Sequence, residues 1–433
     1  MFLMNICIQN GRILDPATGL DKIANILISD TKIARIFQPE EQIALPDDLK
    51  VIDAEGLIVS PGLVDIHVHF REPGFTHKEE IATGAKAAVA GGYTTVVMTA
   101  NTKPVIDNVA ILREVEDKIR FVNAKTPLRI LPSASVSMDL KGKQLTDFDA
   151  LSLAGAAGFT DDGIPITDEA LLKEAFRLAA KVGKPVSLHE EDPALITENG
   201  INAGKVSKAL QITGSPREAE ISMIKRDIRI AENTGAKVNI QHLSTKEGVE
   251  LIRQARKTNP DIHAEVTPHH FSLTEDAVLQ YGTLAKMNPP LRTQEDRLAL
   301  IEGLKDGTSE TIATDHAPHA AEEKALPLTK APSGIIGLET ALSLGITNLV
   351  RPGHLTLLQL LEKMSFNPAK LYGIPCGIRE GADADLVLFD PGHTKLYDCF
   401  RSRSSNSPFL GQKLYGVVRA TICGGRIAYE DLP

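Results

Sequence analysis

The chain has 433 residues, of which 42% are hydrophobic and 24% are charged, and its formal net charge is -9. This length allows one large domain beside a smaller one, with a substantial core, as in an ordinary soluble globular protein. The acidic balance argues against a nucleic-acid or membrane surface, because both require lysine and arginine clustered on one face. An anionic substrate must therefore meet a local cation.

The cysteines and the first residues indicate the compartment. The cysteines form no CxxC pair, which suits unpaired thiols in a reducing environment. The opening Met-Phe-Leu-Met-Asn lacks a basic segment and a long apolar segment, and no later run approaches the roughly 20 apolar residues of a membrane span. We therefore expect a cytoplasmic protein. The four cysteines are Cys7, Cys376, Cys399 and Cys423.

Short strand patterns occupy both ends of the chain. Turn chemistry separates them, as at Asn10-Gly11 near the start and Gly424-Gly425 near the end. Neither end has enough strands for a core of its own, and chain termini often lie close together. Two unrelated β-flaps are the alternative. We expect residues 1–58 and 376–433 to form one composite β-sandwich domain.

Between these ends, strand-like apolar runs alternate with helical patterns, which is typical of βα units and a parallel sheet. Eight units over about 300 residues favour an α/β fold of the (β/α)8 TIM-like barrel type for residues 59–375. A doubly wound sheet is the alternative, although no glycine-rich dinucleotide motif follows the first strand. The expected strands are 63–69, 94–99, 128–132, 157–160, 186–189, 237–242, 262–266 and 311–315. The expected helices are 78–90, 108–121, 168–182, 216–234, 245–257 and 295–304.

The first of these strands carries a histidine pair. Its residues alternate between apolar and polar, so it sends Asp65, His67 and His69 to one face. Two neutral imidazoles at i and i+2 can reach one ion of zinc or of a first-row neighbour. Such a pair is a weak signal alone.

Further metal-ligating side chains fall at the ends of other strands. In a barrel the carboxyl ends of all strands converge on one mouth. Four histidines and two carboxylates exceed the three protein ligands of one catalytic zinc. They suit two ions about 3.5 to 4 Å apart, which would lower the pKa of bound water from 15.7 towards about 7. The predicted ligands are His67, His69, Asp161, His189, His242 and Asp315.

Three segments carry a resemblance to a known family. They are 67–74 (His-Val-His-Phe-Arg-Glu-Pro-Gly), 158–163 (Gly-Phe-Thr-Asp-Asp-Gly) and 314–319 (Thr-Asp-His-Ala-Pro-His), which resemble the dihydroorotases of the metal-dependent amidohydrolase superfamily. The resemblance covers nearly the whole chain. It implies reversible, zinc-dependent cyclisation of N-carbamoyl-L-aspartate to L-dihydroorotate in pyrimidine biosynthesis. It also implies that His67 and His69 bind the first zinc, His189 and His242 bind the second, Asp161 bridges them, and Asp315 is a ligand and the general acid/base.

The residue after the fourth strand separates the relatives from one another. Hydantoinases and allantoinase usually have a carboxylated lysine there, and this chain has none, so it resembles the aspartate-bridged dihydroorotases. Asp162 competes with Asp161 for the bridging position. We prefer Asp161 because it follows the strand directly and matches the family's position.

A receptor for a substrate carboxylate lies close by. Arg71 stands two residues beyond His69 and can hold a carboxylate through two parallel N–H bonds. The resemblance adds Asn101 and His319 for the same carboxylate, Asn288 for the ring, and a turn at residues 333–334. The predicted substrate contacts are thus Arg71, Asn101, Asn288, His319, Ser333 and Gly334.

Other polar residues are expected to have supporting roles. His269 and His270 should support the rim, and His316 should lie behind the ligands. Residues 320–330 are interpreted as a solvated loop.

The expected chemistry leaves two rival functions. Asp315 should take a proton from the attacking water and pass it to the leaving nitrogen, so hydrolysis should rise with pH and cyclisation should fall. One alternative is another cyclic amidohydrolase, a hydantoinase or an allantoinase. The other is a non-catalytic scaffold for aspartate transcarbamoylase, against which the complete ligand set argues. A homo-oligomer is compatible with the sequence.

Overall fold

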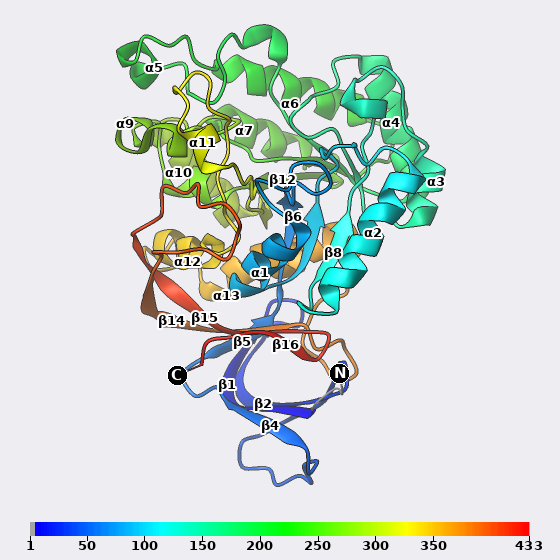
Figure 1. Cartoon of the computed structure of the whole chain (residues 1–433), viewed down its shortest axis with the longest axis vertical. Coiled ribbons are helices and arrows are strands. Elements are labelled where there is room, and N and C mark those ends of the chain that lie inside the picture. Colours follow the sequence, from blue (N-terminus) through cyan, green and yellow to red (C-terminus); the bar gives the residue numbers. More distant parts are fainter. Residues whose placement is uncertain (1–4, 433) are drawn as a thin grey trace.

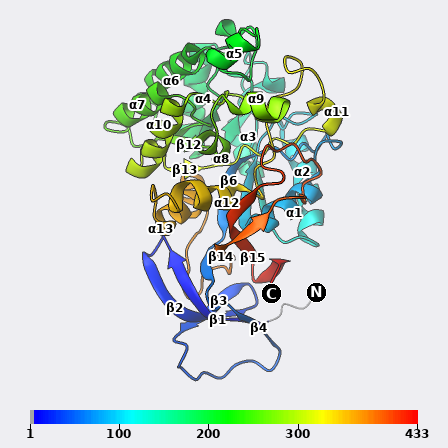
Figure 2. The same cartoon turned by 90° about the vertical axis from the view of Figure 1, so that its left-hand side faces the viewer.

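The computed structural model describes residues 5–432 (Figure 1). A β-rich part built from both ends of the chain lies against a larger part in which helices surround parallel strands (Figures 1 and 2). The described ends of the chain both belong to the β-rich part. None of the helices in the described residues is long and apolar enough to cross a membrane.

Strands from both ends of the chain share one sheet of eight strands, in the order β16-β15-β14-β5-β1-β2-β3 with β4 beside β1. The two ends meet where β5 pairs antiparallel with β14, with Ile58 opposite Phe389. The prediction that both ends fold together is consistent with this pairing. The strands are β1 (Asn5–Asp15), β2 (Leu20–Ser29), β3 (Lys32–Phe37), β4 (Leu49–Asp53), β5 (Ile58–Pro61), β14 (Leu386–Leu396), β15 (Lys413–Cys423) and β16 (Arg426–Glu430).

This sheet differs from the prediction in two respects. Its hydrogen bonding joins all eight strands into one sheet, whereas the prediction was a composite β-sandwich. The predicted turn at Asn10-Gly11 is a bulge inside β1, where the pairing register with β2 shifts between Ile8 and Gly11. Asn10 adopts a left-handed φ of 62°. Asparagine tolerates that conformation better than most residues, which is why the same dipeptide serves in bulges and in turns.

All eight predicted parallel strands are present. They form a three-stranded sheet in the order β6-β7-β8 and a five-stranded sheet in the order β13-β12-β11-β10-β9. Parallel bridges from Ala134 to Phe159 and from Val68 to His316 connect the two sheets at both edges. Nearly every residue of these strands is buried, as expected for parallel strands covered by helices. The strands are β6 (Leu63–Val68), β7 (Tyr93–Met98), β8 (Arg129–Pro132), β9 (Phe159–Thr160), β10 (Val186–Leu188), β11 (Val238–Ile240), β12 (Ile262–Val266) and β13 (Thr311–Ile312).

The helices begin where the sequence places capping residues. The side chains of Asn108, Asp168 and Thr245 accept hydrogen bonds from the first turns of α2, α4 and α7, which satisfies otherwise unpaired N–H groups. The six predicted helices are present as α1, α2, α4, α6, α7 and α10, and the other eight α-helices within residues 5–432 were not predicted. The helices are α1 (Ile81–Ala90), α2 (Val109–Asn123), α3 (Phe148–Ala154), α4 (Glu169–Val182), α5 (Lys205–Ala209), α6 (Arg217–Ala231), α7 (Lys246–Ala255), α8 (Pro268–Ser272), α9 (Ala277–Tyr281), α10 (Gln294–Asp306), α11 (Ala321–Lys324), α12 (Ala341–Gly345), α13 (Leu357–Leu361) and α14 (Asn367–Tyr372).

Candidate metal centre and substrate pocket

Four histidines and one aspartate meet at the carboxyl ends of the parallel strands. His67 and His69 come from the end of β6, and His189 and His242 follow β10 and β11. With Asp162 they make two groups, His67-His69-Asp162 and Asp162-His189-His242, each with ligand atoms within 4.8 Å of one another. Each group could hold a metal ion, and Asp162 belongs to both.

Asp162 lies between the two histidine pairs. Its Oδ1 is 3.4 Å from Nε2 of His67, and its Oδ2 is 3.3 Å from Nε2 of His69. On the other side, Oδ1 is 3.8 Å from Nδ1 of His189 and 4.0 Å from Nε2 of His242. A carboxylate placed in this way can donate one oxygen to each of two ions.

The sequence analysis preferred Asp161 over Asp162 as the bridging residue. That choice was wrong, because Asp162 is the aspartate that faces the histidines. The carboxylate of Asp161 accepts hydrogen bonds from the backbone N–H of Val136 at 2.7 Å and of Ser137 at 3.1 Å, and from the hydroxyl of Ser137. Burial raises the pKa of Asp161 to about 6 despite these bonds. Neighbouring side chains in an extended segment point in opposite directions, so only one of the two aspartates can face the histidines.

Asp315 joins the cluster beside the first histidine pair. Its Oδ1 lies 3.0 Å from Nε2 of His69 and 3.5 Å from Nε2 of His67. The last strand, β13, ends at Ile312, earlier than predicted, and Asp315 has a left-handed φ of 48°. Of the other residues at the cluster, His242 also has a positive φ, at 36°. Such strained backbone is typical of functional sites.

Three of the four imidazoles are oriented by acceptors behind them. Nδ1 of His67 is 2.6 Å from Oε1 of Glu265, and Nδ1 of His69 is 3.0 Å from Oδ1 of Asn101. Nε2 of His189 is 3.2 Å from Oε2 of Glu191. Each acceptor favours the proton on the outer nitrogen, which leaves the lone pair of the inner nitrogen for a cation. The donor set therefore fits metal ions.

The surrounding carboxylates carry negative charge that favours a cation at the cluster. Burial disfavours the imidazolium form of His67, but Glu265, Asp162 and Asp315 outweigh it and raise the pKa of His67 well above its usual value. Burial likewise opposes ionisation of Asp162, but the nearby His67 and the other imidazoles hold the pKa of that carboxyl well below its usual value. A metal cation would supply the same compensation without a bound proton.

Glu265 was missed by the sequence analysis, although a signal was present. Glu265 lies in β12, where Ile262, Ala264 and Val266 alternate with His263 and Glu265. A fully buried acid inside a parallel strand requires a partner. That requirement indicates a supporting role at the neighbouring site.

We expect Glu265→Gln to weaken metal binding by about 10- to 100-fold, because the hydrogen bond that orients His67 loses its charge. Metal affinity measured by chelator competition checks this. Glu220→Gln is the matched control, since Glu220 is equally buried but bonds Ser244 and Thr245 instead. Equal losses in the two variants would refute the assignment.

A pocket of about 360 Å³ opens over the cluster. Its size suits a small ring compound. Three of its side chains carry buried polar atoms that have no hydrogen-bond partner among residues 5–432, namely Oδ1 of Asn288, Oγ of Ser333 and Nδ1 of His319. Unpaired buried atoms of this kind indicate a ligand. All six predicted substrate contacts line the pocket: Arg71, Asn101, Asn288, His319, Ser333 and Gly334.

The predicted substrate contacts differ in the hydrogen bonds that they already make within the protein. Nε of Arg71 donates to the carbonyl of Pro318 at 3.3 Å, and this is the one hydrogen bond recorded for the Arg71 side chain within residues 5–432. Asn101 is more committed, because its amide group also donates to the Asp162 side chain at 3.2 Å. Burial and the charge of Arg71 lower the pKa of His319 to about 2. His319 can therefore donate from Nδ1 to a carboxylate only after an anion has favoured its charged form.

The histidines that were excluded from the site have other partners. Nε2 of His270 is 3.0 Å from the carbonyl oxygen of Pro289. Nε2 of His316 is 3.3 Å from Oε2 of Glu79. The segment 320–330, expected to be a solvated loop, contains helix α11 and the buried Lys324.

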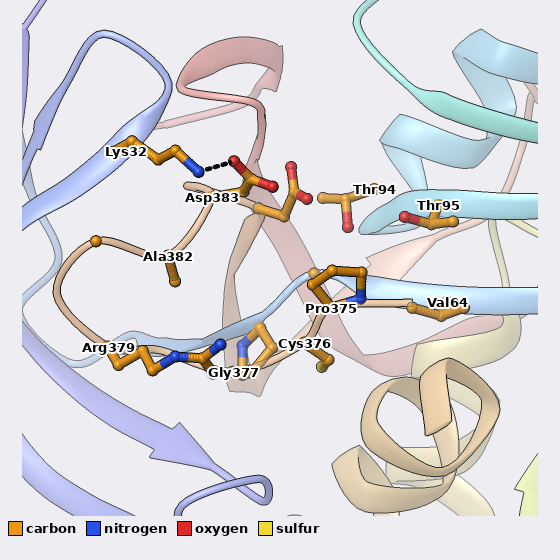
Figure 3. Close-up of a pocket in the computed structure, with 14 residues that line it drawn as sticks. Lys32, Val64, Thr94, Thr95, Pro375, Cys376, Gly377, Arg379, Ala382 and Asp383 are labelled. Carbon is orange, nitrogen blue, oxygen red and sulfur yellow. Dashed lines mark hydrogen bonds and ion pairs between the residues drawn. The ribbon is translucent and has the colours of Figure 1, made fainter. Parts of the chain in front are cut away.

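A second cavity, of about 210 Å³, lies at the opposite ends of β6 and β7, next to the β-rich part (Figure 3). Val64 and Thr94 form one side of it, and Lys32 pairs with Asp383 at 2.7 Å on its rim. No histidine lines it. Burial raises the pKa of the Cys376 thiol there to about 12, so that group is no nucleophile at neutral pH. The reactive side chains thus gather at the other ends of the strands.

Known proteins resemble this chain over most of its length. A model of the amidohydrolase family matches residues 58–428. The chain therefore belongs to the amidohydrolase family. Within it, several relatives that match over their full length are named dihydroorotase. One, from Clostridioides difficile strain 630, is 50% identical over 98% of this chain and 100% of its own length. Another, from Streptococcus pyogenes serotype M3, is 53% identical over 98% of this chain and 100% of its own length. The predicted membership of the dihydroorotases is confirmed.

Solved structures share the architecture at lower identity. The L-hydantoinase (dihydropyrimidinase) of Arthrobacter aurescens is 27% identical, with a TM-score of 0.87 over 99% of this chain and 97% of that protein. A D-hydantoinase from Thermus is 25% identical, with a TM-score of 0.84 over 98% and 95% of the two chains. The sequence is thus about twice as similar to dihydroorotases as to these hydantoinases.

Proposed function

We propose that the chain catalyses the reversible, metal-dependent cyclisation of N-carbamoyl-L-aspartate to L-dihydroorotate. One observation carries this proposal: two buried histidine pairs flank Asp162 at the floor of a pocket whose walls hold unpaired polar atoms. The full-length relatives named dihydroorotase support the choice of substrate. We also infer that β6 to β13 form one closed (β/α)8 barrel, since bridges connect both edges of the two sheets.

The cofactor in this proposal is a pair of zinc ions. His67, His69 and Asp315 would hold one ion, His189 and His242 would hold the other, and Asp162 would bridge them. Bound there, the ions would polarise the ring carbonyl and lower the pKa of water. Four nitrogens and few carboxylates favour zinc over magnesium or calcium, which prefer oxygen ligands.

Asp315 is the proposed general acid/base. In hydrolysis the ring amide C–N bond breaks, and Asp315 accepts a proton from the attacking water and delivers it to the leaving nitrogen. In cyclisation the ureido nitrogen joins the side-chain carboxyl carbon, one proton is consumed and one water leaves. Protonated Asp315 supplies that proton, so the two directions require opposite protonation states of one carboxyl group.

Arg71 is the proposed anchor for the substrate's free carboxylate. We expect Arg71→Met to raise KM for dihydroorotate by about 10²-fold, because a bidentate, charge-assisted contact is lost, while kcat changes less. Steady-state kinetics measure this. Arg379→Met is the matched control, since Arg379 is exposed and lines the second cavity. A KM unaffected by Arg71→Met would contradict the proposal.

The rival functions have direct tests. A hydantoinase or allantoinase would prefer hydantoin or allantoin, so rates with these compounds are compared with the rate for dihydroorotate. The proposal requires dihydroorotate to be the best substrate by kcat/KM. A scaffold without catalysis would show no turnover in the presence of zinc.

Further observations bear on the compartment, the domain division and the assembly state of the protein. All four cysteines are unpaired, which supports a reducing compartment such as the cytoplasm. The division into a composite β domain (1–58 and 376–433) and a catalytic domain (59–375) fits the pairing of β5 with β14. Size-exclusion chromatography with light scattering, with and without aspartate transcarbamoylase, tests for a homo-oligomer and for that partner.

A further inference from the structure

Two buried lysines bond to the turn that forms one wall of the pocket, and one of them, Lys286, also lines the pocket. This turn, residues 331–334, is called the wall turn below. Lys286 and Lys324 are 2% and 6% exposed. Neither has a carboxylate partner within 4 Å among the described residues, since the neighbouring Glu323 pairs with Lys78 at 2.9 Å. Unpaired buried ammonium groups are rare, so their placement requires a reason.

Every carbonyl group of the wall turn accepts a hydrogen bond from a side chain. Nζ of Lys286 donates to the carbonyl of Ala331 at 2.8 Å. Nζ of Lys324 donates to the carbonyls of Pro332 at 2.8 Å and Gly334 at 3.1 Å. Nε2 of His319 lies 2.8 Å from the carbonyl oxygen of Ser333. The negative ends of four successive peptide dipoles therefore face these donors.

This arrangement leaves a donor for the substrate. Across a planar trans peptide, the carbonyl of one residue and the N–H of the next point in opposite directions. The carbonyl of Pro332 faces Lys324, so the N–H of Ser333 points away from that lysine, and Ser333 lines the pocket. No hydrogen bond of this N–H is recorded within residues 5–432. An ammonium group on the carbonyl polarises the peptide and strengthens the N–H as a donor.

We propose that Lys324, supported by Lys286, is a positioning residue for the anionic substrate, because it fixes the wall turn with the Ser333 N–H free and adds positive charge behind it. This inference rests on the proposed function. It differs from the assignment of Arg71, which contacts the substrate directly, because Lys324 acts through the backbone of the wall turn.

The electrostatics agree with this geometry. Burial and the nearby Lys286 lower the pKa of Lys324 to about 7, although Glu323 acts in the opposite direction. The cation is thus held at the expense of stability near neutral pH. An anion bound at the wall turn favours the charged form of Lys324 and relieves that strain, which links the charge of this lysine to the binding of substrate.

The test is Lys324→Met, which keeps the length of the side chain but removes its charge and its donors. Lys324→Met removes hydrogen bonds from a charged donor to the wall turn. We therefore expect KM for both substrates to rise by about tenfold. The value of kcat should stay within a few-fold, because the contact is made equally in the ground and transition states. Lys363→Met is the matched control, since Lys363 is also buried, at 4% exposure, but within residues 5–432 no hydrogen bond like those of Lys324 joins it to the wall turn.

The outcomes separate this inference from the proposed function. If wild-type protein does not convert dihydroorotate, the proposed function fails. If it does, an unchanged KM in folded Lys324→Met overturns the inference alone, and so does an equal rise in KM in Lys363→Met. If Lys324→Met does not fold, Lys324→Gln carries the same expected rise in KM, because it keeps polar donors but has no charge.

Discussion

Asp162→Asn is expected to lose nearly all activity and most bound metal, whereas Asp161→Asn is expected to retain both. The carboxylate of Asp162 lies within 4.0 Å of ligand nitrogens from all four histidines. A neutral amide there cannot offer an oxygen to each of two ions and leaves the imidazole cluster without its shared anion. The expected fall in kcat is at least about 10³-fold, in line with the loss of several kcal/mol of electrostatic stabilisation.

Asp161→Asn is the matched control for that variant. The amide oxygen can still accept from the backbone of Val136 and Ser137, which Asp161 now binds. Stability should fall by about 1 to 2 kcal/mol through the weakened bonds, with metal content unchanged. Metal analysis and thermal unfolding of the two variants measure these effects. The reverse pattern, with Asp161→Asn losing metal and Asp162→Asn keeping it, would restore the assignment made from the sequence.

Asp315→Ala is expected to abolish turnover while keeping part of the metal. The proposed proton transfer is worth about 10² to 10⁴-fold in rate. Within residues 5–432 the one other carboxylate that lines the pocket is Asp162, which is proposed to bridge the metal ions. The two histidine pairs and Asp162 remain, so metal should bind with reduced affinity. Rates in both directions, measured at saturating zinc, check the effect.

Asp315→Asn separates the loss of proton transfer from the loss of metal binding. The amide keeps the volume of the side chain and one oxygen for a metal ion, but it cannot hold the transferred proton. The account requires Asp315→Asn to be nearly as inactive as Asp315→Ala despite higher metal content. If restored metal content brought restored activity, Asp315 would be a ligand only.

The sequence predicted the framework of the site well because that framework depends on local patterns. Alternation in 63–69 places His67 and His69 on one face, and each further histidine follows a short apolar run. Because carboxyl ends of parallel strands share one side of a sheet, the order of strands alone brought these residues together.

The choice between Asp161 and Asp162 required three-dimensional information. Strand β9 has two residues, so its alternation is too short to set which aspartate faces inward. The deciding contact is between Asp161 and Ser137, which lie 24 positions apart. Lys324 shows the same limit: within a charged stretch it resembles a solvated residue, and only the folded wall turn buries it.

The β-rich part shows how one dipeptide can be misinterpreted. Asn10-Gly11 fits a hairpin turn, and it is a bulge because the strand continues with Arg12 and Ile13 paired to β2. Helices α12 to α14 were missed because they come after the last of the eight expected parallel strands, where no further βα unit was expected. Neither error affected the site, because neither segment supplies a residue at the ends of the parallel strands.

The most direct test of the central claim combines metal analysis with activity on the wild-type protein. The purified chain is stripped with a chelator, zinc is returned in steps, and cyclisation of N-carbamoyl-L-aspartate is followed. We expect activity to be lost on stripping and to return as bound zinc approaches about two ions per chain. Full activity in a chain that holds no metal would contradict the account.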